Sequence, residues 1–384
     1  MWVERTARSR SLVLEVRQES GRADGLCAEQ FGFGVAFAPV FPIPTFFRET
    51  NMIQKPNLAN VSLLSVSLKY LSLVSIMLGL SFALLYQAKH VAPMHEHTYA
   101  TFQRLAGLEK SSVIYNAWSP RIASIEISYR FAQIVDAFFR STNSALPLRK
   151  HVEYAVALWT AGWFAAMCVV CILAFQWRSL FYMLGIFAGI SFGYTPLLDF
   201  RIYSWDMPAL FAYVVAVALL AKIRTTLITL VCLSAVIVFA MPFKETSIVL
   251  CIFPLFVCTQ YGIRRRIALT ITIALAAIFL KLTANYYVTG SVFSFATRSF
   301  HDNDILLIWN IKLFFTEPIV LVNAGTLLAM LLSPLWQRKV LMYKAMALIF
   351  IASNFLFGVA NEYRIWFEML PLSLFVLDAT MTGD

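Results

Sequence analysis

The charged side chains of this chain that could do chemistry lie in the short turns and the one long loop that join long apolar stretches. Carboxylates can take up or release a proton, and arginine and lysine can hold an anion, so these turns are candidate parts of one site. The candidate site residues are Glu96, Arg121, Asp199, Arg201, Asp206, Lys244, Glu245, Glu362 and Arg364. Carboxylates placed at random would be spread over all turns. Their restriction to alternate turns predicts a polar site on one side of the protein.

The other turns contain little besides arginine and lysine. Arg178, Lys222 with Arg224, Arg264–Arg266 and Arg338–Lys339 occupy every second connection. Short basic loops of membrane proteins stay in the cytoplasm. We therefore expect these turns and both termini to be cytoplasmic, and the acidic turns to be external.

The composition indicates a membrane protein. Hydrophobic residues make up 60% of the 384 residues, charged residues make up 14%, and the mean hydropathy is +0.71. Apolar runs such as 152–175 and 267–284 are far longer than a barrel strand and are apolar on every face. The fold class that follows is all-α, a polytopic transmembrane helical bundle. The net charge of +10 belongs to residues that flank apolar segments, so we expect contact with membrane lipids and no binding of nucleic acid.

Hydropathy predicts about 10 spans, several of them only about fifteen residues long. The candidate spans are residues 70–88, 152–175, 180–198, 207–221, 225–241, 246–261, 267–285, 319–336, 340–357 and 365–379. The external loop 89–151 carries eight Lys or Arg, but loops of about sixty residues cross the membrane largely regardless of charge. In this loop the 3.6-residue spacing predicts an amphipathic interfacial helix over 122–140 and a shorter one over 98–108. The segment 305–315 is too short to cross a membrane, so we expect it to form a third interfacial or re-entrant helix.

The sequence divides into two parts. Residues 1–51 have no helical periodicity and no signal-peptide core, so we interpret them as a disordered or non-native N-terminal extension before a start at Met52. Residues 52–384 form a single transmembrane domain. The cysteines mostly lie inside apolar runs, and Cys168 and Cys171 are interpreted as packing residues despite their CxxC spacing.

The order of the segments resembles the GT-C superfamily of polytopic membrane glycosyltransferases. A first span is followed by a long outer loop that opens with an acidic residue and continues into amphipathic helices, and then by many spans joined by short turns. The turns 203–208, 243–247 and 362–371 also resemble those of uncharacterised bacterial membrane proteins related to that group. The resemblance covers about residues 65–380 and consists of architecture and short motifs.

The resemblance implies an enzyme that moves a sugar from a polyprenyl-phosphate donor to an acceptor on the outer face of a bacterial inner membrane. Family members carry an Asp or Glu just after the first span, and Glu96 matches it as the general base. The family pattern has a neighbouring Asp, whereas His95 and His97 flank Glu96 here. The cations of the site would hold the donor phosphate and its carboxylates would orient hydroxyls. No cofactor is implied with certainty, and a divalent metal ion stays open.

Other interpretations stay open beside this one. The chain could be a transporter or flippase of lipid-linked glycans or small anions, or a non-catalytic membrane subunit of an envelope-assembly complex. Lys244 could simply neutralise the adjacent Glu245, and Glu368, inside the last apolar run, could be a structural residue paired with Arg364. The sequence carries no signal of the oligomeric state, the sugar or the acceptor.

Overall fold

The computed structural model describes most of the chain after residue 62. The described residues are 63–90, 122–141, 148–195, 203, 205–222, 226–289, 300–335, 337–357, 363 and 366–382. The chain divides into two units, Met1–Ser62 and Leu63–Asp384, and all described residues belong to the second. The predicted N-terminal extension 1–51 and the predicted interfacial helix 98–108 therefore lie outside the described residues.

Every regular element in the described stretches is a helix, as the composition predicts. The α-helices are α2 (Leu63–His90), α4 (Ile122–Ser141), α5 (Leu148–Phe175), α6 (Ser179–Gly193), α7 (Asp206–Lys222), α8 (Thr226–Ala240), α9 (Phe253–Val257), α10 (Ile263–Thr289), α11 (Phe300–Thr316), α12 (Pro318–Leu332), α13 (Arg338–Phe357) and α14 (Leu370–Thr382). The 3-10 helices are η3 (Gln176–Arg178), η5 (Glu245–Ile252) and η7 (Phe367–Met369). A helix satisfies its own backbone hydrogen bonds, so helices can lie in lipid.

Three helical stretches of the described chain are long and apolar enough to cross a membrane: Val66–His90, Val152–Gly193 and Ile263–Ala284. The second consists of α5 and α6 with the η3 turn between them. The other apolar helices are shorter, such as α7 with 17 residues and α12 with 15. A bilayer core of about 30 Å takes about 20 helical residues. Membrane-spanning helices are thus supported, whereas the expected number of about 10 spans exceeds what helix length alone supports.

The predicted span 246–261 is not one continuous α-helix. It consists of η5, a 3-10 helix, followed by the short α9. Pro254 lies at the start of α9. Proline has no backbone N–H, and its ring clashes with the carbonyl four residues earlier, so an α-helix cannot run undisturbed through this position. The predicted interfacial piece 305–315 lies inside α11.

Buried side chains form two apolar clusters. One joins α2, α5 and α6 through residues such as Leu84, Phe164 and Ile186. The other joins α8, η5, α10, α12 and α13 through residues such as Ile237 and Phe350. Helices α7 and α14 contribute to both clusters. These two helices are therefore the centre around which the other helices pack.

The contact between α6 and α14 depends on two glycines. A Cβ added at Gly189 would lie 2.2 Å from a methyl carbon of Leu370, and one at Gly185 would lie 2.7 Å from a methyl carbon of Leu374. Residues four apart share one face of a helix, so the two glycines open a shallow surface for α14. The Tyr363 hydroxyl donates a hydrogen bond of 2.7 Å to the Gly189 carbonyl oxygen at the same contact.

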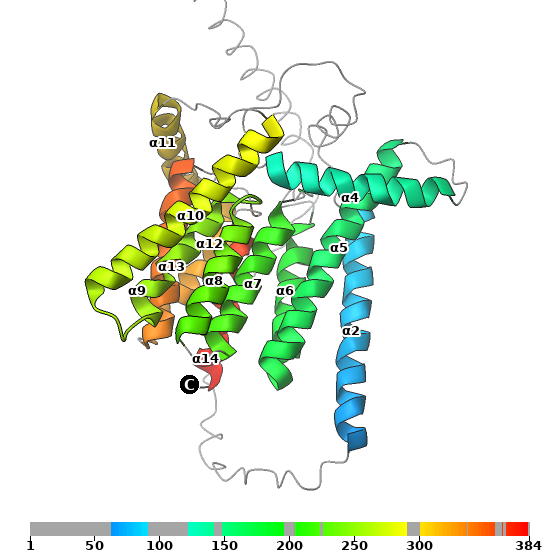
Figure 1. Ribbon diagram of the computed structural model, residues 1–384, viewed down its shortest axis with the longest axis horizontal. Coiled ribbons are helices and arrows are strands. Elements are labelled where there is room, and N and C mark those ends of the chain that lie inside the picture. Colours follow the sequence, from blue (N-terminus) through cyan, green and yellow to red (C-terminus); the bar gives the residue numbers. More distant parts are fainter. Residues whose placement is uncertain are drawn as a thin grey trace, which may run out of the picture. The chain divides into compact units, whose positions relative to one another are not determined.

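The two ends of the helical bundle differ in the residues they carry. In Figure 1, α4 lies across one end of the bundle, transverse to α2 and α5. The other end contains the α5–α6 junction, the end of α7 and the starts of α10 and α13. These four places coincide with the four basic turns of the sequence. The basic turns of the sequence therefore lie at one end of the bundle, opposite to α4.

Candidate functional site

Three charged side chains from distant segments meet inside the bundle. Asp206 is the first residue of α7, where an acidic side chain interacts favourably with the helix dipole. Lys244 has an extended backbone between the end of α8 and the start of η5. Glu368 is the middle residue of η7. Each of them stands at an irregular helix start, where the chain changes direction and a long side chain can reach a neighbouring segment.

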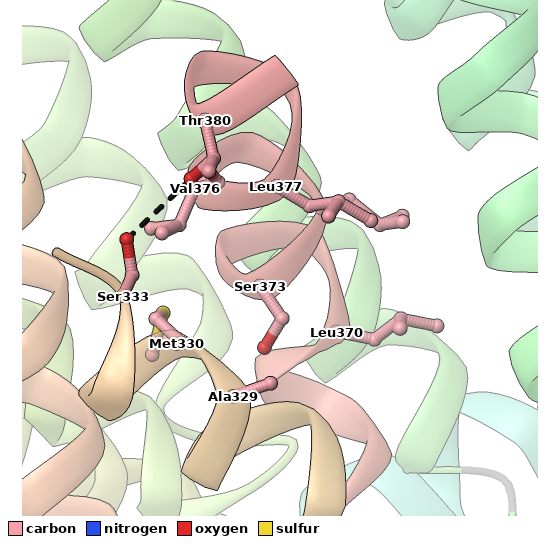
Figure 2. A pocket seen from close by; sticks show the side chains of 9 residues that line it. Ala329, Met330, Ser333, Leu370, Ser373, Val376, Leu377 and Thr380 are labelled. Carbon is pink, nitrogen blue, oxygen red and sulfur yellow. Dashed lines mark hydrogen bonds between the residues drawn. The ribbon is translucent and has the colours of Figure 1, made fainter. Parts of the chain in front are cut away.

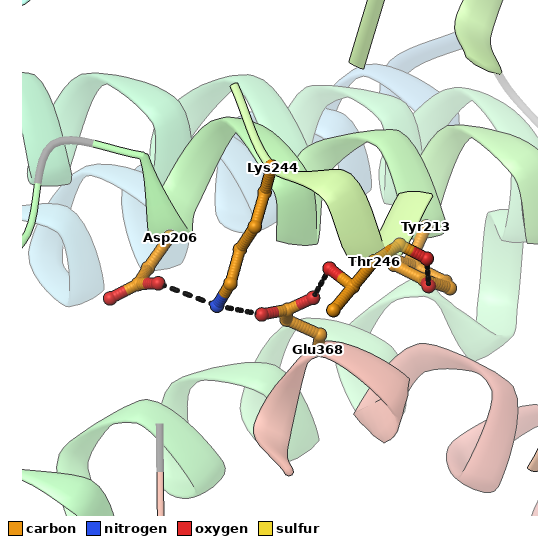
Figure 3. A network of polar contacts seen from close by, with 5 residues as sticks. All are labelled: Asp206, Tyr213, Lys244, Thr246 and Glu368. Carbon is orange, nitrogen blue, oxygen red and sulfur yellow. Dashed lines mark hydrogen bonds and ion pairs between the residues drawn. The ribbon is translucent and has the colours of Figure 1, made fainter. Parts of the chain in front are cut away.

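Lys244 lies between the two carboxylates (Figure 3). Its ammonium nitrogen is 2.7 Å from Oδ1 of Asp206 and also pairs with Oε1 of Glu368. The side chains of Asp206 and Lys244 are each 1% exposed, and that of Glu368 is 0% exposed. We call these three residues the buried ion cluster.

Two uncharged residues extend the buried ion cluster. The Thr246 hydroxyl donates to Oε2 of Glu368, so both oxygens of this carboxylate have a partner. The Tyr213 hydroxyl donates a hydrogen bond of 3.0 Å to the Thr246 carbonyl oxygen. The start of η5 is thereby held against α7 and η7.

The charges of the cluster do not balance. Two carboxylates and one ammonium give a formal charge of −1. The second oxygen of Asp206, Oδ2, is buried and has no hydrogen-bond partner among the described residues. Moving a charge out of water costs several kcal/mol unless a partner compensates it, so this oxygen is the most demanding atom of the cluster.

The acidic neighbour of Lys244 pairs elsewhere. Glu245 Oε2 lies 3.2 Å from the ammonium nitrogen of Lys281 on α10. The Glu245 side chain is 40% exposed, whereas that of Lys281 is 4% exposed. The open interpretation in which Lys244 and Glu245 neutralise each other is therefore wrong, because each has a different partner.

Of the predicted site residues, the structure brings Asp206, Lys244 and Glu245 to one place. The others lie outside the described residues: Glu96, Arg121, Asp199, Arg201, Glu362 and Arg364. Glu368, expected to pair with Arg364, pairs with Lys244. Lys281 was missed, although a lysine in the middle of an apolar run is itself a signal for a buried partner.

A second ion pair lies near the other end of the bundle. Arg178 in η3 donates to Oδ2 of Asp378 on α14 at 3.1 Å, and the Tyr182 hydroxyl donates to the same oxygen at 3.2 Å. Asp378 was not among the residues predicted from the sequence. It is a carboxylate at the basic end, where it neutralises a basic turn.

A pocket between α12 and α14 offers little chemistry. Its volume is about 230 Å³, and its walls are apolar except for the hydroxyls of Ser333, Ser373 and Thr380 (Figure 2). The Ser333 and Thr380 hydroxyl oxygens lie 3.4 Å apart. No carboxylate, amine, imidazole or thiol of the described chain lines it. The most deeply buried charged side chains of the described chain are instead those of the buried ion cluster.

The described helices offer no ligand set for a metal ion. No group of three or more His, Cys, Asp or Glu in this part of the chain is arranged to hold one. Cys168 and Cys171 are buried and free, consistent with packing residues. His95 and His97 lie outside the described residues.

Comparison of the chain with protein-family models, curated proteins and solved structures found no match. The class of protein therefore rests on the fold and the buried ion cluster. The described chain is an all-α protein with helices able to cross a membrane and with a charged cluster between them.

Proposed function

We propose that the protein is a membrane-embedded glycosyltransferase that moves a sugar from a polyprenyl-phosphate donor to an acceptor at the outer face of a bacterial inner membrane. The observation that carries the proposal is the convergence of Asp206, Lys244 and Glu368 from three distant segments. Asp206 and Lys244 belong to the acidic turns, Glu368 lies at the start of the last apolar run, and Glu245 with Lys281 adjoins them. A protein without a polar site has no use for so many buried charges in one place, because each is costly in an apolar interior.

In this proposal the buried ion cluster shapes the site, and residues of the neighbouring acidic turns contact the substrates. Lys244 already touches two carboxylates, so its ammonium holds Asp206 and Glu368 in position instead of binding phosphate. The donor phosphate is then left to Arg121, Arg201 and Arg364, whose guanidinium groups can bind phosphate oxygens in pairs. Glu96 acts as the general base that takes the proton of the acceptor hydroxyl.

The proposal includes a place for the protein in the membrane. About 10 membrane passages, the shorter ones shielded by neighbouring helices, bring both termini to the cytoplasmic side and the acidic turns to the outside. Helix α4 then lies at the outer interface, close to a lipid-linked donor. The partners in this proposal are the polyprenyl-linked sugar and the surrounding lipids.

Transport of a lipid-linked glycan or small anion is the second candidate. It is favoured by one observation, the position of Lys244 and Glu368 at the irregular starts η5 and η7. Transporters build their sites from helices that are interrupted within the membrane. Enzyme and transporter differ in whether the bond between sugar and phosphate is broken.

The test is sugar transfer in membranes that contain the full chain, assayed with polyprenyl-phosphate sugars. We expect transfer by the wild type and a loss of at least about 100-fold for Glu96→Gln, since a general base contributes about 10²–10⁴-fold. Arg364→Ala should lower transfer as well. The matched control is Arg264→Ala, an exposed cation at the start of α10 that should keep full activity.

Full transfer by both Glu96→Gln and Arg364→Ala would refute the proposed site. No transfer from any donor by the wild type would refute the enzyme, and movement of an intact lipid-linked sugar across vesicles would then support transport.

A further inference from the structure

The buried ion cluster has more negative than positive charge, and no other side chain of the described helices corrects this. Lys244 is the cation between Asp206 and Glu368, and all three side chains are at most 1% exposed. The neighbouring cation Lys281 pairs with Glu245, so this pair adds no net charge.

The available atom is on Asp206. Glu368 uses both oxygens, one toward Lys244 and one toward the Thr246 hydroxyl. Asp206 uses Oδ1 toward Lys244, while its buried Oδ2 has no hydrogen-bond partner in the described stretches and points away from the ammonium (Figure 3). A carboxylate oxygen without a partner and without water is the costly case for a buried charge.

We propose that the buried ion cluster is a binding site for one proton, at Oδ2 of Asp206. With the proton bound, the formal charge of the three side chains is zero. Uptake of H⁺ converts the Asp206 carboxylate to a carboxylic acid, and release returns the proton to water. A single free oxygen suits a proton, whereas a metal ion such as Na⁺ needs several oxygen ligands. This inference goes beyond the proposed function and holds for an enzyme or a transporter.

The groups around Asp206 do not replace this proton. Tyr213 on α7 is buried and donates its hydroxyl to a backbone carbonyl. Tyr194, at the end of α6, is buried and uncharged. Glu245 of η5 and Lys281 of α10 form their own ion pair, and the charge of the cluster is unchanged by them.

The experiment measures the thermal unfolding midpoint of the purified full chain in detergent. Chloride salts of Na⁺ and choline are compared at equal ionic strength, at about pH 6 and about pH 9, a range above the titration of free carboxyl groups. A proton bound only in the folded state predicts a midpoint that falls by a few degrees as the pH rises, equally in both salts. NaCl and choline chloride should give the same midpoint at each pH, and a midpoint raised by NaCl alone would indicate bound Na⁺ and would overturn the proposal.

Asp206→Asn should abolish the pH dependence, because it removes the charge that the proton balances. It should also fold, since its cluster is formally neutral without the proton. The matched control is Glu153→Gln on α5, a carboxylate outside the cluster whose partner Lys150 is 57% exposed, and it should leave the wild-type dependence intact.

Equal pH dependence in the wild type and in Asp206→Asn would overturn the proposal. If Asp206→Asn fails to fold, Glu368→Gln neutralises the same cluster and replaces it in the comparison. A readout on the wild type alone also decides the question. Infrared spectra at about pH 6 that lack the carbonyl band of a buried carboxylic acid would overturn the proposal.

Discussion

Lys244 and Glu245 are neighbours in the sequence but lie in opposite surroundings. The Lys244 side chain is 1% exposed and touches two carboxylates, whereas the Glu245 side chain is 40% exposed and pairs with one lysine. Salt bridges open to water contribute little to stability, while breaking a buried one leaves an uncompensated charge. Two adjacent substitutions should therefore have very different costs.

Lys244→Met should lower the free energy of unfolding by about 3–5 kcal/mol, because two buried carboxylates lose their cation. Glu245→Gln should lower it by less, because Glu245 is 40% exposed to water, although its partner Lys281 is 4% exposed and loses this carboxylate. Urea unfolding of both variants in one detergent measures the difference. Equal losses in the two variants would show that the ammonium of Lys244 does not balance the cluster.

Tyr213→Phe removes one hydroxyl and leaves the ring in place. The Thr246 carbonyl oxygen, at a part-buried contact, then loses the donor that holds it at 3.0 Å. A buried acceptor left without its donor costs about 1–3 kcal/mol. We expect a lower unfolding midpoint and faster amide hydrogen exchange in η5. Exchange unchanged in η5 would mean that this bond does not position the cluster.

The residues of the cluster can be identified in the sequence, but their pairing cannot. Asp206, Lys244 and Glu368 stand out there as charged residues in otherwise apolar surroundings. Which carboxylate meets which amine depends on how α7, η5 and η7 pack, and sequence spacing holds no information on that. Proximity along the chain favoured Arg364 for Glu368 and Glu245 for Lys244, and in both cases the observed partner is a more distant residue.

At the scale of the helices, the close contact of α6 with α14 can be tested by adding a methyl group to a glycine of α6. Gly189→Ala places a methyl group 2.2 Å from a methyl carbon of Leu370. The leucine side chain must then move, and such overpacking costs about 1–3 kcal/mol. The same change at Gly79 on α2 meets no atom of the described chain within 4 Å and should not destabilise. Unfolding midpoints measure both variants.

A second substitution separates crowding from other effects. Leu370→Ala removes the crowding methyl groups, so the pair Gly189→Ala with Leu370→Ala should lose less stability than the sum of the two single changes. Simple additivity in this double-mutant cycle would contradict the close approach of the two helices.

Helix α4 presents an apolar face that the described helices do not cover. Ala132 and Val135 are buried, whereas Ile134 is 68% exposed and Ile127 and Phe138 are also exposed. The predicted amphipathic helix is confirmed in its bounds. The exposed apolar side chains extend its buried face outward, as in a helix that lies in the membrane interface.

A spin label at position 134 should therefore be relaxed by oxygen, which concentrates in lipid, and a label at position 133 should be relaxed by a water-soluble nickel complex. Gln133 is exposed and bonds to the Tyr129 hydroxyl on the polar side. The labels are attached to Ile134→Cys and Gln133→Cys in a background without other reactive thiols. Equal access of both reagents to the two sites would place α4 in water instead of at the interface.

Helix positions were largely predictable because apolar periodicity and turn residues are local properties. The predicted stretches 152–175, 207–221 and 340–357 match α5, α7 and α13 within a few residues. The prediction of one continuous helix over 246–261 was wrong. Hydropathy counts Pro254 as an apolar residue and takes no account of its missing N–H. The use of α7 and α14 by both apolar clusters could not be predicted, since it depends on long-range packing.

At the scale of the whole molecule, the separation of charges predicts an orientation in the membrane. The junction of α5 and α6, the end of α7 and the starts of α10 and α13 lie at the end opposite to α4 (Figure 1). These places carry the short basic turns of the sequence, which membrane proteins retain in the cytoplasm. The buried ion cluster would then lie toward the external side.

Reporter fusions test this orientation directly. A fluorescent protein fused after Arg178, Lys222 or Arg266 should be fluorescent, as it is when it folds in the cytoplasm. Alkaline phosphatase fused after Ala240, at the end of α8, should be active, because this enzyme needs the oxidising exterior to form its disulfides. The reverse pattern would turn the bundle over and place Asp206 and Lys244 toward the cytoplasm. This result would exclude an outward-facing transferase. Glu245 and the acidic turns would then face the cytoplasm, and an acceptor on the outer face of the membrane could not reach them.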